Sequence, residues 1–336
     1  HPVAVRAIAA REAAAVASGR KRVWRGLFTG NDTSDVWLGY PNMSSHTAIV
    51  ARRRAPVSAS RFPAWFGIIL VSVVLAISLA LSLAVGARFV PIDEVVLSLF
   101  GTGDQNVLNI VGELRVTRTV NAVICGVALG AAGVLMQALT RNPIADPGML
   151  GVSAGASFGV VAGMSVLGAL GVDGTIWLAL AGAALASAVI FWFSGTRFAS
   201  GSPVRLILAG VAFSAILAGA AQAIVLTDET VLDAFRFWRV GSLTARPVEE
   251  ALPLVGFIVV GAALALLLGP ALNLMALGDD SAIALGVKPG VVRALVLVAV
   301  TLLCGTATAI AGPIAFVGLV IPHLLRRLVG PDLRLV

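Results

Sequence analysis

Long apolar stretches without a charged residue follow one another along the chain from residue 62 onward. A transmembrane helix needs about 20 apolar residues to cross the hydrocarbon core of a bilayer, so each stretch of at least that length predicts one crossing. The six stretches of suitable length are 62–87, 119–140, 147–172, 174–196, 206–227 and 251–278.

A seventh uncharged stretch, 294–325, is longer than a single crossing requires. Gly312-Pro313 lies near its middle, and a proline cannot donate the hydrogen bond that continues a helix. We therefore expect two further crossings, at 292–311 and 314–329. Together these stretches predict an all-α fold, a polytopic transmembrane helix bundle with eight spans in this chain.

The amino-acid composition excludes a soluble enzyme. Hydrophobic residues make up 58% of the 336 residues, charged residues make up 12%, and the mean hydropathy is +0.97. A soluble domain carries about 25% charged residues. This chain has too few charges to cover a water-exposed surface, which favours a membrane protein.

The net charge of +7 comes from the N-terminal tail, residues 1–64. The tail holds ten basic and three acidic residues, whereas the remainder holds 14 of each. The charge therefore does not indicate a nucleic-acid partner. We expect a disordered basic tail, in which Met43 is a candidate start, followed by a membrane domain over 65–336. Basic residues beside the first span predict a cytoplasmic N-terminus.

The positions of cysteine and histidine do not favour a metal site or a disulfide. Cys125 and Cys304 lie inside apolar stretches, and His1, His46 and His323 lie far apart in the sequence. Neither set has the spacing of metal ligands. We therefore expect buried free thiols and no bound metal.

Glycines recur at every fourth position of one predicted helix, at Gly151, Gly155, Gly159 and Gly163. They form a smooth strip that lets another helix approach closely in lipid, so we expect them to pack helices. The same segment twice matches the G-x-S-x-G pattern of serine hydrolases. A serine nucleophile needs a base within hydrogen-bond reach, and His323, the histidine of the membrane domain, lies on another predicted helix. An intramembrane protease is therefore the weakest alternative.

The chain contains no G-x-x-x-x-G-K-[ST] phosphate-binding loop, so we do not expect it to hydrolyse ATP by itself. None of the first six apolar stretches contains an Asp or Glu. Ion-coupled carriers usually place ionisable groups near the membrane midplane, which disfavours a secondary transporter. That alternative stays open, because backbone carbonyls alone can bind sodium.

The segment 140–156 is the most specific feature of the sequence. It contains Arg141, Asn142, Pro143, Asp146 and Pro147. Asp146 and Pro147 suit the cap and first turn of a helix, so the segment predicts a Pro-bounded turn followed by a helix. It resembles the signature of FecCD-type permeases, the membrane subunits of ABC importers for iron–siderophore complexes, haem and cobalamin. Five further segments agree with that family in the same order: 113–119, 208–212, 238–243, 277–287 and 311–327.

The resemblance implies a ten-helix fold, so the last two helices of the family are expected to be missing after Val336. It also implies a non-catalytic permease without a cofactor, in a bacterial cell membrane. Two permease subunits, as a homodimer or a heterodimer, would form the path, with an extracytoplasmic substrate-binding protein outside and ATPase subunits inside. We expect an iron–siderophore chelate as substrate, with haem and cobalamin as alternatives.

Two arginines mark the outer start of the second predicted span. Arg115 and Arg118 lie three positions apart and therefore share a helical face. The resemblance favours docking of the binding protein, whose carboxylates the forked Arg side chains would bind. Interfacial anchoring is the alternative. In the outer loop 228–250, three aromatic residues among arginines predict a short helix along the outer surface.

The inner loop after the sixth stretch predicts a second short helix. Asp279 or Asp280 can cap its free N–H groups, and Gly286 suits the left-handed residue that ends it. The resemblance implies that this loop docks the ATPase, and a solvated loop without a partner is the alternative. The residues expected to take part are Gly278, Asp279, Asp280, Ser281, Ala282, Leu285 and Gly286.

Overall fold

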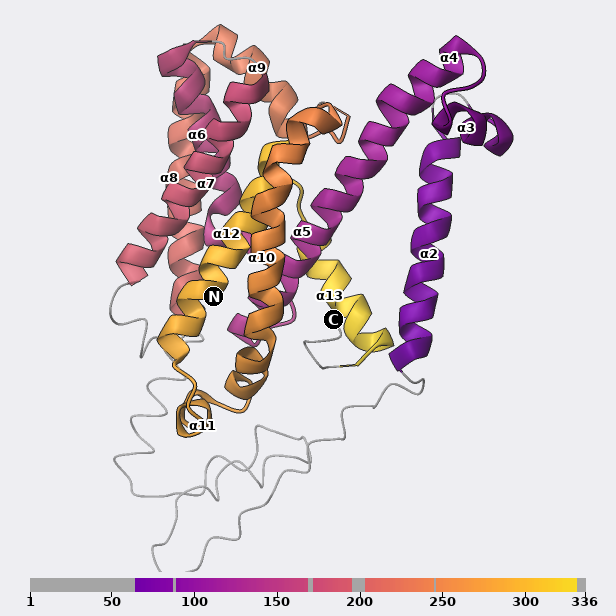
Figure 1. Cartoon of the computed structure of the whole chain (residues 1–336). Helices are drawn as coiled ribbons and strands as arrows, with labels where there is room; N and C mark the ends of the chain where they lie inside the picture. Colours follow the sequence, from indigo (N-terminus) through magenta and orange to yellow (C-terminus); the bar gives the residue numbers. More distant parts are fainter. Residues whose placement is uncertain (1–63, 87–88, 169–171, 195–202, 245, 331–336) are drawn as a thin grey trace, which may run out of the picture. The chain divides into compact units, whose positions relative to one another are not determined.

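The computed structural model describes residues 64–86, 89–168, 172–194, 203–244 and 246–330, which belong to one unit, Ser58–Val336. The tail predicted over 1–64 lies outside the described residues except for its last position. The described chain is helical and contains no strand, which confirms the all-α fold (Figure 1). The elements are α2 (Ala64–Ala84), α3 (Ile92–Leu99), α4 (Gln105–Leu108), the π-helical η2 (Asn109–Val116), α5 (Thr117–Thr140), η3 (Pro147–Leu150), α6 (Val152–Leu167), α7 (Val172–Ser194), α8 (Pro203–Thr227), α9 (Glu229–Val240), α10 (Val248–Met275), α11 (Asp279–Ala284), α12 (Pro289–Ala311) and α13 (Val317–Leu328).

Six helices of the described chain are long and apolar enough to cross a membrane, whereas the sequence predicts eight full crossings. These six are Trp65–Ala84, Gln105–Thr140, Gly174–Trp192, Ile207–Thr227, Val248–Met275 and Pro289–Ala311. The other two predicted crossings contain shorter helices, α6 with 16 residues and α13 with 12. At about 1.5 Å per residue, neither reaches across a hydrocarbon core of about 30 Å.

Both helices are short because a break in the α-helical backbone precedes each of them. Before α6, the chain forms the short 3-10 helix η3 and passes Gly151, which has a φ of +75°. Before α13, Gly312 (φ +78°) and Pro313 end α12, and residues 312–316 are not helical. A left-handed residue does not continue a right-handed helix. The break at Gly312-Pro313 confirms the prediction, whereas the break at Gly151 corrects the full-length span predicted over 147–172.

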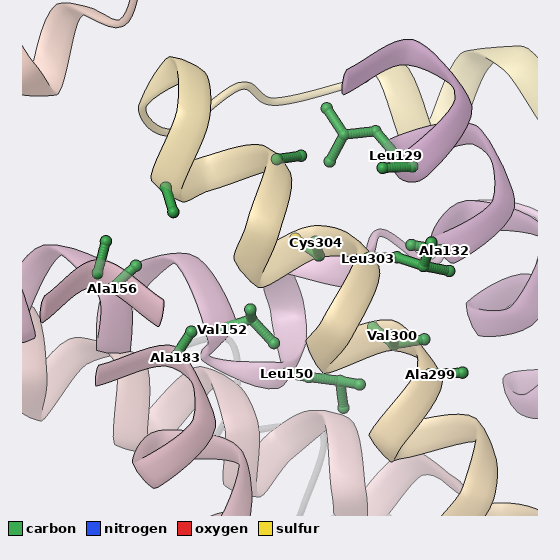
Figure 2. Close-up of a cluster of buried hydrophobic side chains, with 14 of the residues drawn as sticks. Leu129, Ala132, Leu150, Val152, Ala156, Ala183, Ala299, Val300, Leu303 and Cys304 are labelled. Atoms are coloured by element: carbon green, nitrogen blue, oxygen red, sulfur yellow. The ribbon is translucent and has the colours of Figure 1, made fainter. Parts of the chain in front are cut away.

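The core lies around α12, which packs against α5, α6, α7 and α10. In its membrane-crossing window 78% is buried inside the protein, compared with 6% for α2. Figure 2 shows Leu303 and Cys304 of α12 in one cluster with Leu150 of η3 and Val152 at the start of α6. Cys304 and Cys125 are both buried free thiols, as predicted.

The glycine strip of α6 lies against α7. A Cβ atom at Gly155 or at Gly159 would lie 2.5 Å from a backbone carbonyl oxygen of α7, and one at Gly163 would lie 2.3 Å from a Leu178 side-chain carbon. At the N-terminal end of the strip, a Cβ at Gly151 would lie 2.8 Å from a side-chain carbon of α7. Only residues without a side chain allow the two helices to pack this closely.

Two short helices, α9 and α11, lie at opposite ends of the bundle, and α5, α10 and α12 run between these ends (Figure 1). The Asp228 side chain caps α9 by accepting hydrogen bonds from the N–H groups of Thr230 at 2.9 Å and Val231 at 3.2 Å. The short helix predicted within 228–250 is therefore confirmed. The two ends are the places where candidate functional residues gather.

Candidate functional site

Glycines bound the short helix α11 on both sides. Gly278 precedes it with a φ of +115°, and Gly286 follows it with a φ of +84°. The N-cap is Gly278, which has no side chain, and Asp279 and Asp280 lie in the first turn. The expected capping by an aspartate is therefore wrong, because the chain turns at the glycine and brings the acidic residues in one position later. In the first turn, their negative charges still interact favourably with the positive N-terminal end of the helix dipole.

The carboxylate of Asp279 bridges two arginines that belong to two different long helices. Its Oδ1 accepts a hydrogen bond from Arg141 Nη2 at 2.6 Å, and its Oδ2 accepts one from Arg293 Nη2. Arg141 ends α5 in a left-handed conformation with a φ of +52°. Arg293 lies near the start of α12 and is only 4% exposed. Asp279 thus joins α11 to α5 and to α12.

The environment of Asp279 keeps its side chain ionised at neutral pH. Burial by itself would raise the pKa of this carboxyl group, but the hydrogen bonds and charges of Arg141 and Arg293 outweigh burial and hold the pKa below its ordinary value. Hydrogen bonds between ionised partners are roughly twice as strong as neutral ones. The two bridges therefore form a charged connection that persists at physiological pH.

The α11 segment exposes three large apolar side chains, beside the exposed Asp280 and Ser281. Leu277, Ile283 and Leu285 are each more than half exposed, and we name them the α11 surface. Ala282 is instead fully buried and faces the bundle, so it cannot contact a partner as the sequence led us to expect. Single exposed leucines are common, and three large apolar side chains in one short loop segment make it a candidate for contact with a partner.

The other residues of the 140–156 motif build the turn between α5 and α6. The Oδ1 atoms of Asn142 and Asp146 each accept a hydrogen bond from the N–H two residues later, at 3.1 and 2.8 Å. Burial raises the pKa of Asp146, and that hydrogen bond opposes the effect. Pro143 is exposed, whereas Pro147 is buried against the start of α13, where a Cβ at Gly318 would lie 2.8 Å from its Cδ. Among the motif residues, Arg141 makes the contact with α11.

Arg115 and Arg118 turn toward the C-terminal end of α2. Arg115 Nη1 donates to two carbonyl oxygens at 2.7 Å each, and Arg118 Nη2 donates to two more. The four acceptors are the carbonyl oxygens of Ser82, Leu83, Ala84 and Val85. The last carbonyls of a helix have no partner within the helix, so the two arginines complete α2. Arg115 is 4% exposed, so it is buried at this end of the bundle, whereas docking of a partner needs an accessible side chain.

At the α9 end, the side chain of Asn121 joins α5 to the segment 241–246, of which the structure describes 241–244 and 246. Its Nδ2 donates to the carbonyl oxygens of Leu243 at 2.9 Å and Arg246 at 3.0 Å. Asn121 is a functional candidate that the sequence patterns do not predict. The available signal was a polar amide inside an otherwise apolar span, but nothing local to the residue indicates its partners.

The same segment also meets the C-terminal end of α12. The backbone N–H of Ser242 donates to the carbonyl oxygen of Ala311 at 2.9 Å. A Cβ at Gly312 would lie 2.7 Å from the carbonyl oxygen of Trp238, so the backbones are in close contact there. A cavity of about 220 Å³ lies beside this contact and is lined in part by Trp238, Ser242 and Gly312.

A metal-binding cluster and a serine nucleophile are two kinds of site that the described ranges could contain. No group of three or more His, Cys, Asp and Glu side chains that could hold a metal ion occurs within them. Ser157, one of the two G-x-S-x-G serines, donates to the carbonyl oxygen of Ser153 in its own helix at 2.9 Å. These serines lie among the glycines that pack α6, which gives them a structural setting.

The chain is similar to known transport proteins over most of its length. Residues 74–336 match the FecCD transport family. The chain belongs to this family. The FecCD-family chain is 45% identical over 260 residues to the ferric enterobactin transport system permease protein FepD of Escherichia coli (strain K12), a match that covers 77% of the chain and 78% of FepD.

Two further relatives are named for the transport of other substrates. The FecCD-family chain is 35% identical over 262 residues to the Fe(3+)-citrate import system permease protein YfmD of Bacillus subtilis (strain 168), which covers 78% of each protein. It is 38% identical over 227 residues to the hemin transport system permease protein HmuU of Yersinia pestis, which covers 66% of the chain and 67% of HmuU.

A solved structure shares the fold. The FecCD-family chain superposes on an inward-facing conformation of a metal-chelate type ABC transporter with a TM-score of 0.69 and 27% identity, over 80% of this chain and 82% of that one. Together with the six apolar spans, this likeness shows a multi-pass membrane protein of the ABC permease type. A permease of this type works with an ATPase and a binding protein.

Proposed function

We propose that this chain is the membrane permease subunit of an ATP-driven importer for iron–siderophore chelates, which an extracytoplasmic binding protein delivers. The observation that carries the proposal is the 45% identity to a ferric enterobactin permease over 77% of the chain. The permease subunit does no bond chemistry, and ATP hydrolysis takes place on separate cytoplasmic subunits. A second permease subunit, identical or homologous, completes the path.

Haem import is the second candidate substrate function. The observation that favours it is the 38% identity to a hemin permease. The lower identity and the shorter match rank it below a siderophore importer. The two candidates share the family, the fold and the partners, so transport measurements with defined chelates separate them.

We place the α11 end of the bundle in the cytoplasm and the α9 end outside. Basic residues next to the first span favour a cytoplasmic N-terminus. α2 begins at the α11 end and finishes at the α9 end (Figure 1). The same orientation leaves Arg141, Lys288 and Arg293 at the cytoplasmic side, which agrees with the positive-inside rule.

The α11 surface suits docking of an ATPase subunit. Leu277, Ile283 and Leu285 present apolar area that would be buried in a groove of the partner. The Asp279 bridges to Arg141 and Arg293 hold the helix that carries this area in a fixed position. A preorganised apolar projection loses little conformational entropy on binding, which favours affinity.

Uptake measurements test the substrate assignment. Cells that lack their own iron permeases would express this protein with its ATPase and binding protein and receive ⁵⁵Fe-labelled catecholate chelate, ⁵⁵Fe-citrate, haem or cobalamin. We expect ATP-dependent uptake of a ferric siderophore and at least tenfold slower uptake of haem and cobalamin. Preferred uptake of haem would select the second candidate, and uptake driven by an ion gradient without ATP would exclude an ABC importer.

Substitutions on the α11 surface test the docking assignment. Ile283→Glu with Leu285→Glu places two charges in the proposed contact, and we expect at least tenfold less ATPase to copurify with the permease. Leu232→Glu is the matched control, because Leu232 is exposed on α9 at the other end. Equal recovery of the ATPase with all variants would contradict docking at α11.

Docking of the binding protein at Arg115 and Arg118 stays a prediction. Their hydrogen bonds to the end of α2 support a different role, attachment of that helix. Arg118 is the more accessible of the two and is the better candidate for contact with a partner.

A further inference from the structure

α5 and α12 are joined to each other through a short segment at each end of the bundle. The segment is α11 at one end and 241–246 at the other. At the α11 end, Asp279 bridges Arg141 of α5 and Arg293 of α12. At the α9 end, the segment 241–246 accepts hydrogen bonds from Asn121 of α5 and donates one to the last residue of α12. The connections therefore close a ring that includes both helices and both ends of the bundle.

The helices between these connections are continuous. α5 has 24 residues and α12 has 23, without a break inside either, and the two pack against each other. Near the α9 end of α12, Cys125 Sγ lies 3.8 Å from the carbonyl oxygen of Ala307. α10 packs against both helices and connects the segment 241–246 to α11 directly along the chain. A packed set of helices joined at both ends resists bending and sliding.

We propose that Asp279 and Asn121 are positioning residues that make α5, α10, α11, α12 and the segment 241–246 one rigid unit, the coupling unit. Displacement of α11 by its partner then moves the segment 241–246 and, through it, α9. This inference rests on the proposed docking of an ATPase at α11. It assigns the transmission of force across the membrane to two polar bridges, at Asp279 and at Asn121.

The breaks in the bundle lie at the borders of the coupling unit. α6 is separated from α5 by the turn at 141–151, and α13 is separated from α12 by the non-helical residues 312–316. Phe316, just before α13, has a φ of +69°, a left-handed conformation that is uncommon for an aromatic residue. These segments can absorb relative movement, whereas the continuous helices transmit it.

A distance measurement across the membrane tests the proposal. The complete transporter, with ATPase and binding protein, would be reconstituted in liposomes and spin-labelled at Val240→Cys on α9 and Leu208→Cys on α8. Both positions are exposed, at 83% and 62%, and α8 lies outside the coupling unit. Pulsed EPR would give the distance with and without a nucleotide, and copurification would show that the ATPase remains bound.

We expect the nucleotide to change this distance in the parent and to change it by less than half as much in Asp279→Asn and in Asn121→Ala. Asp93→Asn is the matched control, because it removes the same charge from an exposed residue of α3, outside the coupling unit, and should keep the full change. Asp279→Glu retains the charge and should restore most of the effect. The double variant should be no worse than the worse single variant, because both bridges act in one connection.

The results separate this inference from the proposed function. A full distance change in Asp279→Asn or Asn121→Ala, with the ATPase bound, would overturn the inference, and so would a parent without any nucleotide-dependent change. Failure of the ATPase to bind the parent at all would instead count against docking. If Asp279→Asn does not accumulate in the membrane, Asn121→Ala at the opposite end decides by the same criterion.

Discussion

Replacement of Arg115 with methionine tests whether this arginine holds α2 or receives the binding protein. The change keeps a long side chain but removes two hydrogen bonds, each 2.7 Å long, to the last turn of α2. α2 has little other contact with the bundle, since 6% of its membrane-crossing window is buried. A hydrogen bond from a charged donor contributes about 1.5–3 kcal/mol, so the attachment of α2 should weaken by about 3 kcal/mol or more.

Thermal unfolding of the purified protein in detergent would measure this loss as a lower Tm. Arg115→Lys should restore only part of the stability, because an ammonium group lacks the planar fork of the guanidinium. Arg239→Met is the matched control, since Arg239 is exposed at the same end of the bundle. If Arg115→Met unfolded like the parent and no longer captured the binding protein, the role in holding α2 would be refuted and the docking prediction would stand.

Three further changes probe packing and charge. Gly133→Ala should lower the free energy of unfolding by about 1–3 kcal/mol, because its Cβ would lie 1.9 Å from the Gly318 carbonyl oxygen. Gly126→Ala on the same helix meets nothing within 4 Å and should not lower Tm, because alanine favours a helix more than glycine does. Gly312→Ala should speed hydrogen exchange in the chain after α9, because its φ of +78° strains any residue with a side chain. The Asp279 bridges should persist above the ordinary carboxyl pKa of about 4 and disappear only as the pH falls through the lower pKa of the folded state. Faster hydrogen exchange of α11 already between about pH 7 and pH 5 would contradict this sign.

Much of the helix arrangement follows from the sequence, because insertion into lipid depends on local runs of apolar residues. Local signals predict both the break at Gly312-Pro313, from its backbone chemistry, and the short helix after Asp228, from aromatic residues among arginines. The span at 147–172 was overestimated, because a lack of charge does not distinguish a helix from non-helical chain that the protein buries. Only the left-handed Gly151 in the folded chain marks where that helix begins.

The sequence by itself determined the class of protein, the places where most helices cross and the family that the 140–156 motif indicates. Tertiary structure alone decided which polar groups meet. Asp279 and Arg141 lie 138 positions apart, and Arg115 reaches carbonyl oxygens more than 30 positions earlier. The physical reason is that a charged side chain in a membrane protein must find partners wherever helix packing removes it from water. Periodicity along one helix shows which face is apolar, but it contains no information about which distant helix supplies the partner.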